Sequence, residues 1–241
     1  MKKLSKRLLA LARLAGEGGC LADVGCDHGY LSIYLVEQGA FRRAIAMDVG
    51  AGPLERAKMH IKERGLSPYI ETRRSDGLSA LEKGEAQSIV IAGMGGALMT
   101  RILSRGASVI EEDTTLVLQP QSEIMEFRNY LAGRGFRLLE EEMVQEDGKF
   151  YPMMKITGLG YGTKENGFSS IELKYGPLLL RKKHPVLKEY LHCQQQKQEE
   201  IIKRLLVAAK EQKKEERTRQ VYQELEEIRQ ALGGYEDGYG L

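Results

Sequence analysis

The chain has 241 residues, of which 42% are hydrophobic and 29% are charged. This balance excludes the disordered and membrane-spanning classes of protein, and no run of about 18 uninterrupted apolar residues is present. The formal net charge is only +2, so an anionic partner must be met by a local basic patch. The three cysteines Cys20, Cys26 and Cys193 form no CxxC pair. They predict neither a disulfide framework nor a metal site, and they favour a reducing, cytoplasmic compartment.

The first two-thirds of the chain has the pattern of an α/β protein. Residues 1–15 repeat apolar side chains with a helical period, which predicts an amphipathic helix and not a signal peptide. Short apolar runs then alternate with helical patterns, as in a parallel sheet with crossover helices. The expected strands cover residues 20–24, 43–47, 70–74, 88–92, 114–118, 136–144 and 150–157. The expected helices between them cover residues 29–38, 53–64, 96–104 and 122–134. Because Asp147-Gly148 is a hairpin turn signal, we predict a Rossmann-like sheet of five parallel strands plus an antiparallel hairpin.

The distribution of glycine and proline along the chain changes near residue 165. Of the 27 glycines, 22 lie at or before Gly167, and none lies within residues 177–232. Apolar side chains in residues 186–232 recur at spacings of three and four, as in packed helices. We therefore expect one domain over residues 1–165 and an α-helical coiled-coil domain over residues 166–241. Its two antiparallel helices are expected to turn near the charged run 210–219, and the chain is expected to fray from residue 233.

The loop after the first expected strand contains DVGCDHG (residues 23–29), a relative of the GxGxxG turn in which Asp27 replaces the second glycine. Small residues let the backbone approach a ligand there, but Asp23 and Asp27 would repel a pyrophosphate. S-adenosylmethionine instead presents an ammonium and a sulfonium, which attract carboxylates. An ordinary glycine-rich turn is the alternative.

The next two expected strands also end in acidic residues. Asp48 lies 23 residues beyond Gly25, a position from which a carboxylate accepts hydrogen bonds from ribose hydroxyls. Its alternative role is to cap the following helix. Asp76 and Gly77 form a polar turn that is suited to an adenine edge, although a plain Asx-turn is nearly as good an interpretation.

The remaining candidates follow the fourth and fifth strands and the hairpin. The run AGMGG (residues 92–96) has no ionisable side chain, so a planar base or a methyl group can approach its backbone closely. Gln119 and Gln121 place amides beside the same cleft. At the hairpin tip, Lys149 is suited to phosphate and Tyr151 to stacking on a base. Tight turns, and a charged turn with one buried aromatic, are the alternatives.

Together these motifs resemble the bacterial TrmK family: LADVGCDHGYL, MD, RSDGL, AGMGG, LQPQ and EDGKFY, in this order and followed by a helical tail. Members of that family are S-adenosylmethionine-dependent tRNA methyltransferases that modify N1 of adenine 22. They have a Rossmann-like catalytic domain and a C-terminal coiled coil. The resemblance therefore implies S-adenosylmethionine as cofactor and tRNA as partner, with catalysis assigned to residues 1–165.

The resemblance also implies roles for individual residues. The expected cofactor contacts are Asp23, Gly25, Asp27, His28 and Gly29 at the first turn, Asp48 at the ribose, Asp76 and Gly77 at the adenine, and Gly93 and Met94 beside the methyl group. The expected substrate contacts are Gln119, Gln121, Lys149 and Tyr151. N1 of adenine carries an in-plane lone pair, so catalysis requires positioning and charge stabilisation more than a base. Asp27 is the first candidate for accepting a hydrogen bond from the exocyclic amine and His28 the second, although both are equally suited to holding the cofactor.

The helical domain is expected to grip the tRNA backbone through its basic side chains, which are interleaved with glutamates. Dimerisation through the same helices is the competing use. Other functions also stay open at this stage: methylation of another RNA or of a small molecule, nicotinamide-dependent oxidoreduction, or a non-catalytic adaptor role.

Overall fold

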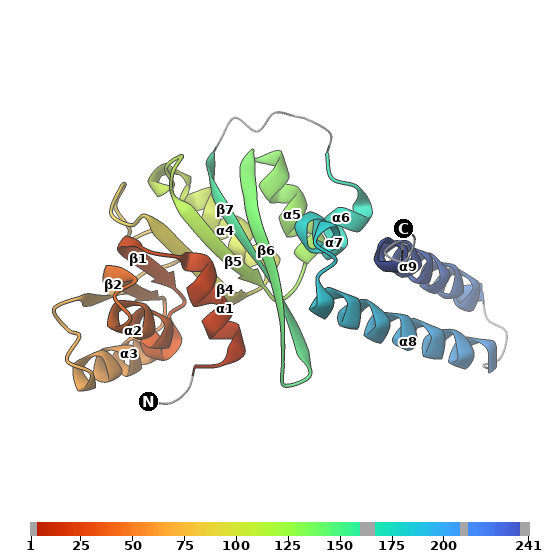
Figure 1. Cartoon of the computed structure of the whole chain (residues 1–241), viewed down its shortest axis with the longest axis horizontal. Helices are drawn as coiled ribbons and strands as arrows, with labels where there is room; N and C mark the ends of the chain where they lie inside the picture. Colours follow the sequence, from red (N-terminus) through yellow and green to blue (C-terminus); the bar gives the residue numbers. More distant parts are fainter. Residues whose placement is uncertain (1–3, 160–166, 208–211, 237–241) are drawn as a thin grey trace. The chain divides into compact units, whose positions relative to one another are not determined.

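The computed structural model describes residues 4–159, 167–207 and 212–236, and Figure 1 shows the whole chain. The chain divides into two compact units, Met1–Gly167 and Phe168–Leu241. This division falls close to the boundary expected at residue 165. The glycine-rich segment expected around that boundary lies largely outside the described residues.

In the described part of the first unit, seven strands form one sheet in the order β3-β2-β1-β4-β5-β7-β6. Strands β1 to β5 run parallel, and β7 is antiparallel to both β5 and β6. The predicted α/β class, with five parallel strands and a hairpin, is confirmed. The strands are β1 (Gly18–Val24), β2 (Phe41–Asp48), β3 (Ile70–Arg74), β4 (Ser88–Met94), β5 (Thr115–Pro120), β6 (Phe136–Glu146) and β7 (Lys149–Leu159). The helices are α1 (Lys6–Ala15), α2 (Tyr30–Glu37), α3 (Ala51–Glu63), α4 (Gly96–Arg105) and α5 (Ile124–Gly133), with short 3₁₀ turns η1 (Asp27–Gly29) and η2 (Ala107–Val109).

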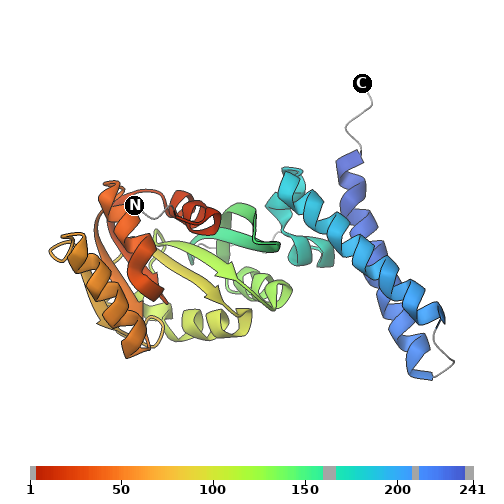
Figure 2. The same cartoon turned by 90° about the horizontal axis from the view of Figure 1, so that it is seen from below.

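Both faces of this sheet are buried, because helices cover each of them. Leu21 and Val90 point into the core formed with α1, α2 and α3. The alternate residues Ala22 and Ile89 point into the core formed with α4 and α5. Figure 2 shows α1 and α4 on opposite faces of the sheet. Strands buried on both faces read as continuous apolar runs, which is why the sequence located them well.

The β6–β7 hairpin closes the sheet as expected. Asp147 and Gly148 both have positive φ, of 49° and 72°, as a two-residue type I′ turn requires. The register across the hairpin pairs Val144 with Tyr151. On the other side of β7, Met154 pairs with Leu118 of β5. Because these strands are antiparallel, Tyr151, three residues before Met154, lies at the carboxyl end of β5.

A buried ion pair joins α5 to β6. Arg128 Nε donates a 2.9 Å hydrogen bond to Glu141 Oε1, and the two side chains are only 4% and 0% exposed. Glu141 is the middle residue of three consecutive glutamates. Strand alternation turns this one inward, where only a cationic partner can compensate for its lost hydration.

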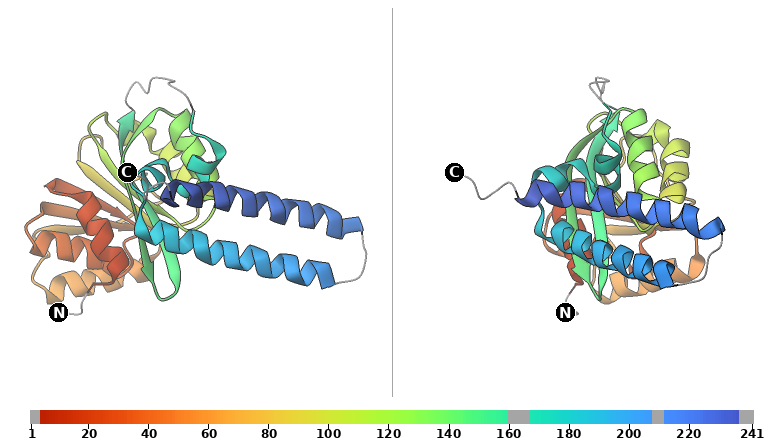
Figure 3. Two further views of the ribbon diagram at one scale, coloured as in Figure 1. Left: turned by 45° about the vertical axis from the view of Figure 1, so that its right-hand side comes forward. Right: turned by 90° about the vertical axis from the view of Figure 1, so that its right-hand side faces the viewer.

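The second unit is helical. Its helices are α6 (Ser170–Tyr175), α7 (Pro177–Arg181), α8 (Pro185–Val207) and α9 (Gln212–Glu236). Figure 3 shows α8 and α9 side by side and antiparallel. Ile202 on α8 packs with Val221 and Leu225 on α9, which matches the apolar spacing in the sequence.

The end of the last helix differs from expectation. Helix α9 continues across Gly233 and Gly234 to Glu236, so the fraying expected from residue 233 is wrong for residues 233–236, and residues 237–241 lie outside the described residues. The last turn is anchored because the Tyr235 hydroxyl donates a 3.2 Å hydrogen bond to the His184 carbonyl oxygen. Residues 212–219 of the charged run are helical, and the rest of the expected turn lies outside the described residues.

Candidate active site

Asp23 lies near the carboxyl end of β1, on the sheet face covered by α2. Its Oδ2 accepts a 2.8 Å hydrogen bond from the Ser32 hydroxyl, and the residue is only 6% exposed. Burial raises the pKa of Asp23 to about 6, with hydrogen bonds from Ser32 opposing this and the charge of Asp48 adding to it. No cationic side chain among the described residues pairs with Asp23. A buried carboxylate without a counter-charge is suited to a cationic ligand.

The loop after β1 is tied to β2 by its backbone. The N–H groups of Gly25 and Cys26 donate to the Met47 carbonyl oxygen at 2.8 and 3.0 Å, and the Gly29 N–H donates to the Cys26 carbonyl oxygen at 2.7 Å. Gly25 has a φ of 77°, and a Cβ there would lie 2.4 Å from Cε of Met94. Only glycine therefore fits at Gly25 without displacing its neighbours.

Asp27 and His28 form the outer side of this loop, against α3. Asp27 Oδ1 accepts a 3.1 Å hydrogen bond from Arg56 Nη2 and lies 3.6 Å from His28 Nε2. The rings of His28, Tyr30 and His60 are nearly parallel, with centroids 5.2–5.4 Å apart. His60 Nδ1 lies 3.0 Å from the His28 carbonyl oxygen. Partners from α3 thus fix the orientation of both candidate catalytic residues.

Asp48 occupies the end of β2, as the ribose role requires. Its Oδ1 accepts a 2.8 Å hydrogen bond from the Gly50 N–H. Gly50, and not Asp48, is the N-cap of α3, so the capping alternative for Asp48 is not seen. The acidic residues Asp48 and Asp23 are close enough for the charge of one to raise the pKa of the other.

The turn after β3 lies beside Asp48, because the Ser75 N–H donates a 2.9 Å hydrogen bond to the Asp48 carbonyl oxygen. The Asp76 side chain is exposed, with its Oδ2 3.6 Å from Arg105 Nη1. Gly77 has a φ of 63°, and a Cβ there would lie 2.9 Å from the Ile102 side chain. The pair Asp76-Gly77 thus flanks the cleft beyond the expected ribose position.

Gly93 is a β-bulge at the end of β4. The register with β5 shifts between Ala92, which pairs with Gln119, and Met94, which pairs with Pro120. Gly93 is left without a partner in the ladder and has a φ of 78°. Bulges are common beside active sites, where they change the direction of the chain. The segment AGMGG therefore contains a bulge in β4 as well as the turn into α4.

Gln119 is fully buried, and its amide is already engaged. Its Oε1 accepts from Arg7 Nη1 at 3.1 Å and from the Gly93 N–H at 3.2 Å. Its Nε2 donates to the Pro120 carbonyl oxygen at 3.0 Å. These hydrogen bonds hold Arg7 and the Gly93 bulge in place, and the substrate contact expected of Gln119 stays a prediction.

The other expected substrate residues are placed unequally. Gln121 is exposed, and its backbone N–H donates to the Met94 carbonyl oxygen at 2.9 Å. The Tyr151 ring lies beneath Arg7, whose guanidinium carbon is 5.6 Å from the ring centroid. Lys149 is exposed at the hairpin tip, and in the described part of the chain no hydrogen bond or ion pair joins it to the other predicted residues.

Comparison with known proteins shows the family of the chain. The family model of TrmK, tRNA (adenine(22)-N(1))-methyltransferase, matches residues 21–230. The chain belongs to this family. The reaction of TrmK is S-adenosylmethionine-dependent methylation of tRNA at N1 of adenine 22.

Relatives support the assignment to TrmK along most of the chain. The Bacillus subtilis tRNA (adenine(22)-N(1))-methyltransferase is 36% identical over 188 residues, covering 76% of this chain and 78% of the relative. The crystal structure of B. subtilis TrmK superimposes with a TM-score of 0.82 at 31% identity, covering 96% of this chain and 100% of the other. Streptococcus pneumoniae Sp1610, solved with S-adenosyl-L-methionine, gives a TM-score of 0.79 at 32% identity, covering 95% and 100% of the two chains.

Three residues that contact the predicted site residues were not predicted from the sequence. Arg7 was assigned only to the helical pattern, although it lies between Leu4 and Leu8 at the edge of the apolar stripe. Arg56 and His60 went unnoticed, although their spacing of four places them on one face of α3. That face packs against η1, which no local signal indicates.

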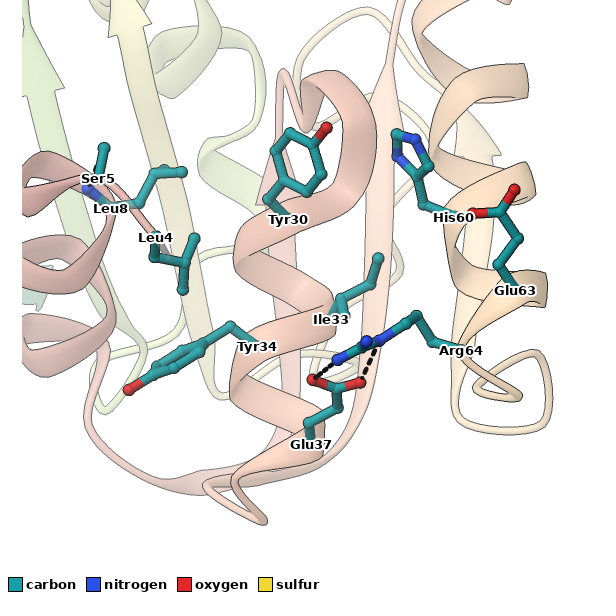
Figure 4. A pocket seen from close by; sticks show the side chains of 10 residues that line it. All are labelled: Leu4, Ser5, Leu8, Tyr30, Ile33, Tyr34, Glu37, His60, Glu63 and Arg64. Atoms are coloured by element: carbon teal, nitrogen blue, oxygen red, sulfur yellow. Dashed lines mark hydrogen bonds and ion pairs between the residues drawn. The ribbon is translucent and has the colours of Figure 1, made fainter. Parts of the chain in front are cut away.

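An apolar hollow of about 360 Å³ lies beside the first loop, between the start of α1, α2 and α3. Figure 4 shows Tyr30 and His60 at one end of it and the ion pair between Glu37 and Arg64 at the other. None of the residues predicted to bind cofactor or substrate lines this hollow. The predicted cofactor residues therefore lie outside this hollow.

Two absences hold for residues 4–159, 167–207 and 212–236. No helix there is both long and apolar enough to cross a membrane. No group of three or more histidine, cysteine or acidic side chains there is arranged to hold a metal ion.

Proposed function

We propose that this TrmK family member holds S-adenosylmethionine at the carboxyl ends of β1, β2 and β4 and transfers its methyl group to N1 of adenine 22 in tRNA. The observation that carries the proposal is the convergence of Asp23, Asp48 and the Gly93 bulge at one edge of the sheet. The unneutralised carboxylate of Asp23 fits the α-ammonium of the cofactor. The glycines at positions 25 and 93 keep side chains out of the space between these residues.

The residues at the ends of β1 and β2 are proposed to bind different parts of the cofactor. Asp23 is suited to the cationic end of the cofactor and Asp48 to the ribose hydroxyls, which donate hydrogen bonds to a carboxylate. Asp76 and Gly77 flank the adenine end. Since these groups are held by backbone contacts within the first unit, little ordering is needed when the cofactor binds.

Catalysis is proposed to rest on positioning. S-adenosylmethionine, when bound, supplies an electrophilic methyl group on its sulfonium. The Gly93 bulge and Met94 border the point of transfer, and Tyr151 is suited to stacking on the extruded base. Asp27, oriented by Arg56, is the proposed acceptor for the exocyclic amine, whose acidity rises as positive charge develops on the purine. His28 is the second candidate for this role.

The kinetic constants of Asp27→Asn and His28→Ala separate catalysis from cofactor binding. A catalytic role predicts a lower kcat with little change in S-adenosylmethionine affinity. A higher Kd for S-adenosylmethionine with unchanged kcat would assign the residue to the cofactor instead.

The activity itself is tested by incubating the protein with S-adenosylmethionine and unmodified tRNA, followed by nucleoside mass spectrometry. We expect 1-methyladenosine in tRNA that has adenine at position 22, and none in a matched transcript with guanine there. Asp48→Asn should abolish the product at limiting cofactor, whereas Asp113→Asn, an exposed loop substitution, should not. Methylation of both transcripts would refute the position assigned to the reaction.

The second unit is proposed to contribute to tRNA binding. Lys182, Lys183 and Lys203 are exposed on it, and phosphate contacts supply most non-specific affinity for nucleic acid. Replacing these three lysines by glutamine should weaken tRNA binding and leave cofactor binding unchanged. Dimerisation through α8 and α9 is the alternative use, which sedimentation analysis detects. A tRNA substrate also supports a cytoplasmic location.

A further inference from the structure

Arg7 brings a positive charge to the ligand-binding edge of the sheet. Its Nη1 donates to Gln119 Oε1 at 3.1 Å, and its guanidinium lies over the Tyr151 ring. A Cβ on Gly93 would lie 3.5 Å from the same nitrogen. Arg7 therefore touches two of the residues that surround the expected point of methyl transfer.

The charge of Arg7 is not neutralised within the described part of the chain, where its side-chain partners are the neutral amide of Gln119 and the ring of Tyr151. Five other arginines of this unit pair with carboxylates, in addition to the buried Arg128. These pairs are Arg13 with Glu142, Arg56 with Asp27, Arg64 with Glu37, Arg73 with Glu85 and Arg105 with Asp76. Others, such as Arg42 and Arg101, have no ion pair among the described residues. Arg7 differs from the latter in being held at the carboxyl ends of the strands. An arginine fixed by a buried amide, with N–H groups to spare, presents a planar fork to an anion.

The positive sign of this charge argues against a direct contact between Arg7 and the reacting base. A fixed cation beside the purine would oppose the positive charge that develops there, so a direct contact with the base would slow the reaction. A phosphate next to the target nucleotide has the opposite sign, and phosphate contacts position a nucleic acid. The anchored start of α1 supports such a contact, because Ser5 caps the helix by accepting from the Leu8 N–H at 3.2 Å.

We propose that Arg7 binds a backbone phosphate of the tRNA next to the target adenine, and so sets the position of the base above the Gly93 bulge. Gln119 then acts as the buried support that aims the guanidinium. The inference rests on tRNA being the substrate, so methylation by the unsubstituted protein is measured first in the same assay.

The test compares tRNA binding by the full-length protein, Arg7→Met and Arg7→Lys over a range of salt concentrations. Arg7→Met keeps the length of the side chain but removes its charge. We expect it to raise the Kd for tRNA about tenfold and to reduce the slope of log affinity against log salt by about 0.7–0.9, the value of one lost phosphate contact. Arg7→Lys should restore the slope, because lysine keeps the charge. The Kd for S-adenosylmethionine should stay unchanged in both variants.

Arg13→Met is the matched control, since Arg13 lies on the same helix and pairs with Glu142. It should leave the salt slope unchanged. A merely structural role for Arg7 would lower turnover without changing the salt slope, and this result would overturn the proposal. Equal slopes for Arg7→Met and the unsubstituted protein would do so as well. If the unsubstituted protein failed to methylate tRNA, the substrate assignment would fall first.

Discussion

The buried carboxylate of Asp23 makes cofactor affinity depend on pH. Burial raises its pKa to about 6 from an ordinary 3.8, so the side chain changes from ionised to neutral between pH 7 and pH 5. Only the ionised form attracts the α-ammonium of S-adenosylmethionine. Affinity for the cofactor should therefore fall as the pH falls through 6.

The magnitude follows from the pKa. With a pKa of about 6, the ionised fraction of Asp23 falls about tenfold between pH 7 and pH 5, and the Kd for S-adenosylmethionine should rise by about the same factor. Without cofactor, lowering the pH has the opposite effect and stabilises the fold, because a carboxyl group with a raised pKa binds its proton more tightly in the folded than in the unfolded protein. Its stabilising contribution is complete below pH 3.8 and is lost as the pH rises through about 6. At pH 7 the ionised, buried Asp23 costs about 3 kcal/mol.

Isothermal titration of S-adenosylmethionine at several pH values checks this reasoning, with Asp23→Asn and Asp113→Asn as companions. Asp23→Asn should bind weakly at every pH, without the step near pH 6, and should raise the free energy of unfolding at pH 7 by up to about 3 kcal/mol. Asp113→Asn should keep the step. A Kd that is independent of pH in the unsubstituted protein, or a step that persists in Asp23→Asn, would refute the role given to this carboxylate.

Three further substitutions test the fold and the loop. Glu141→Ala removes the carboxylate that pairs with the buried Arg128 and should lower the free energy of unfolding by about 3–5 kcal/mol, as measured by urea denaturation. Replacing the pair together by Leu and Met should recover most of the loss, and a mild effect of Glu141→Ala alone would contradict the burial. Gly25→Ala should abolish cofactor binding in a titration, whereas Gly39→Ala should not, because Gly39 has a similar φ of 72° but open space around it. Leu225→Ala should destabilise the helical unit by about 2–5 kcal/mol in thermal unfolding, with cofactor affinity unchanged; a loss of cofactor binding would argue against independent units.

The sheet could be predicted because its signals are local. An apolar run bounded by glycines placed the first strand within the observed bounds of β1, Gly18–Val24, and Asp147-Gly148 located the hairpin. The first loop and Asp48 were found for the same reason, since each directly follows a strand. What the sequence cannot indicate is which distant helix packs over a loop.

Arg7 and Glu141 illustrate that limit. Arg7 reaches Gln119 across 112 residues of chain, and the partner of the inward-facing Glu141 is an arginine that a separate element, α5, supplies. The end of α9 is a further case. Its two glycines predict a stop, but the hydrogen bond from Tyr235 to the start of α8 stabilises another turn.

The loop between β1 and α2 takes its shape from main-chain hydrogen bonds, from Gly25 and Cys26 to the Met47 carbonyl oxygen and from Gly29 to the Cys26 carbonyl oxygen. The side chains of Asp27 and His28, the proposed catalytic residues, make none of these bonds. A substitution at position 27 should therefore leave the curvature of the loop unchanged, whereas position 28, with a φ of 65°, favours residues that tolerate the left-handed region. Position 27 is thus the place in this loop where a single mutation can change the chemistry of the site without changing the path of the backbone.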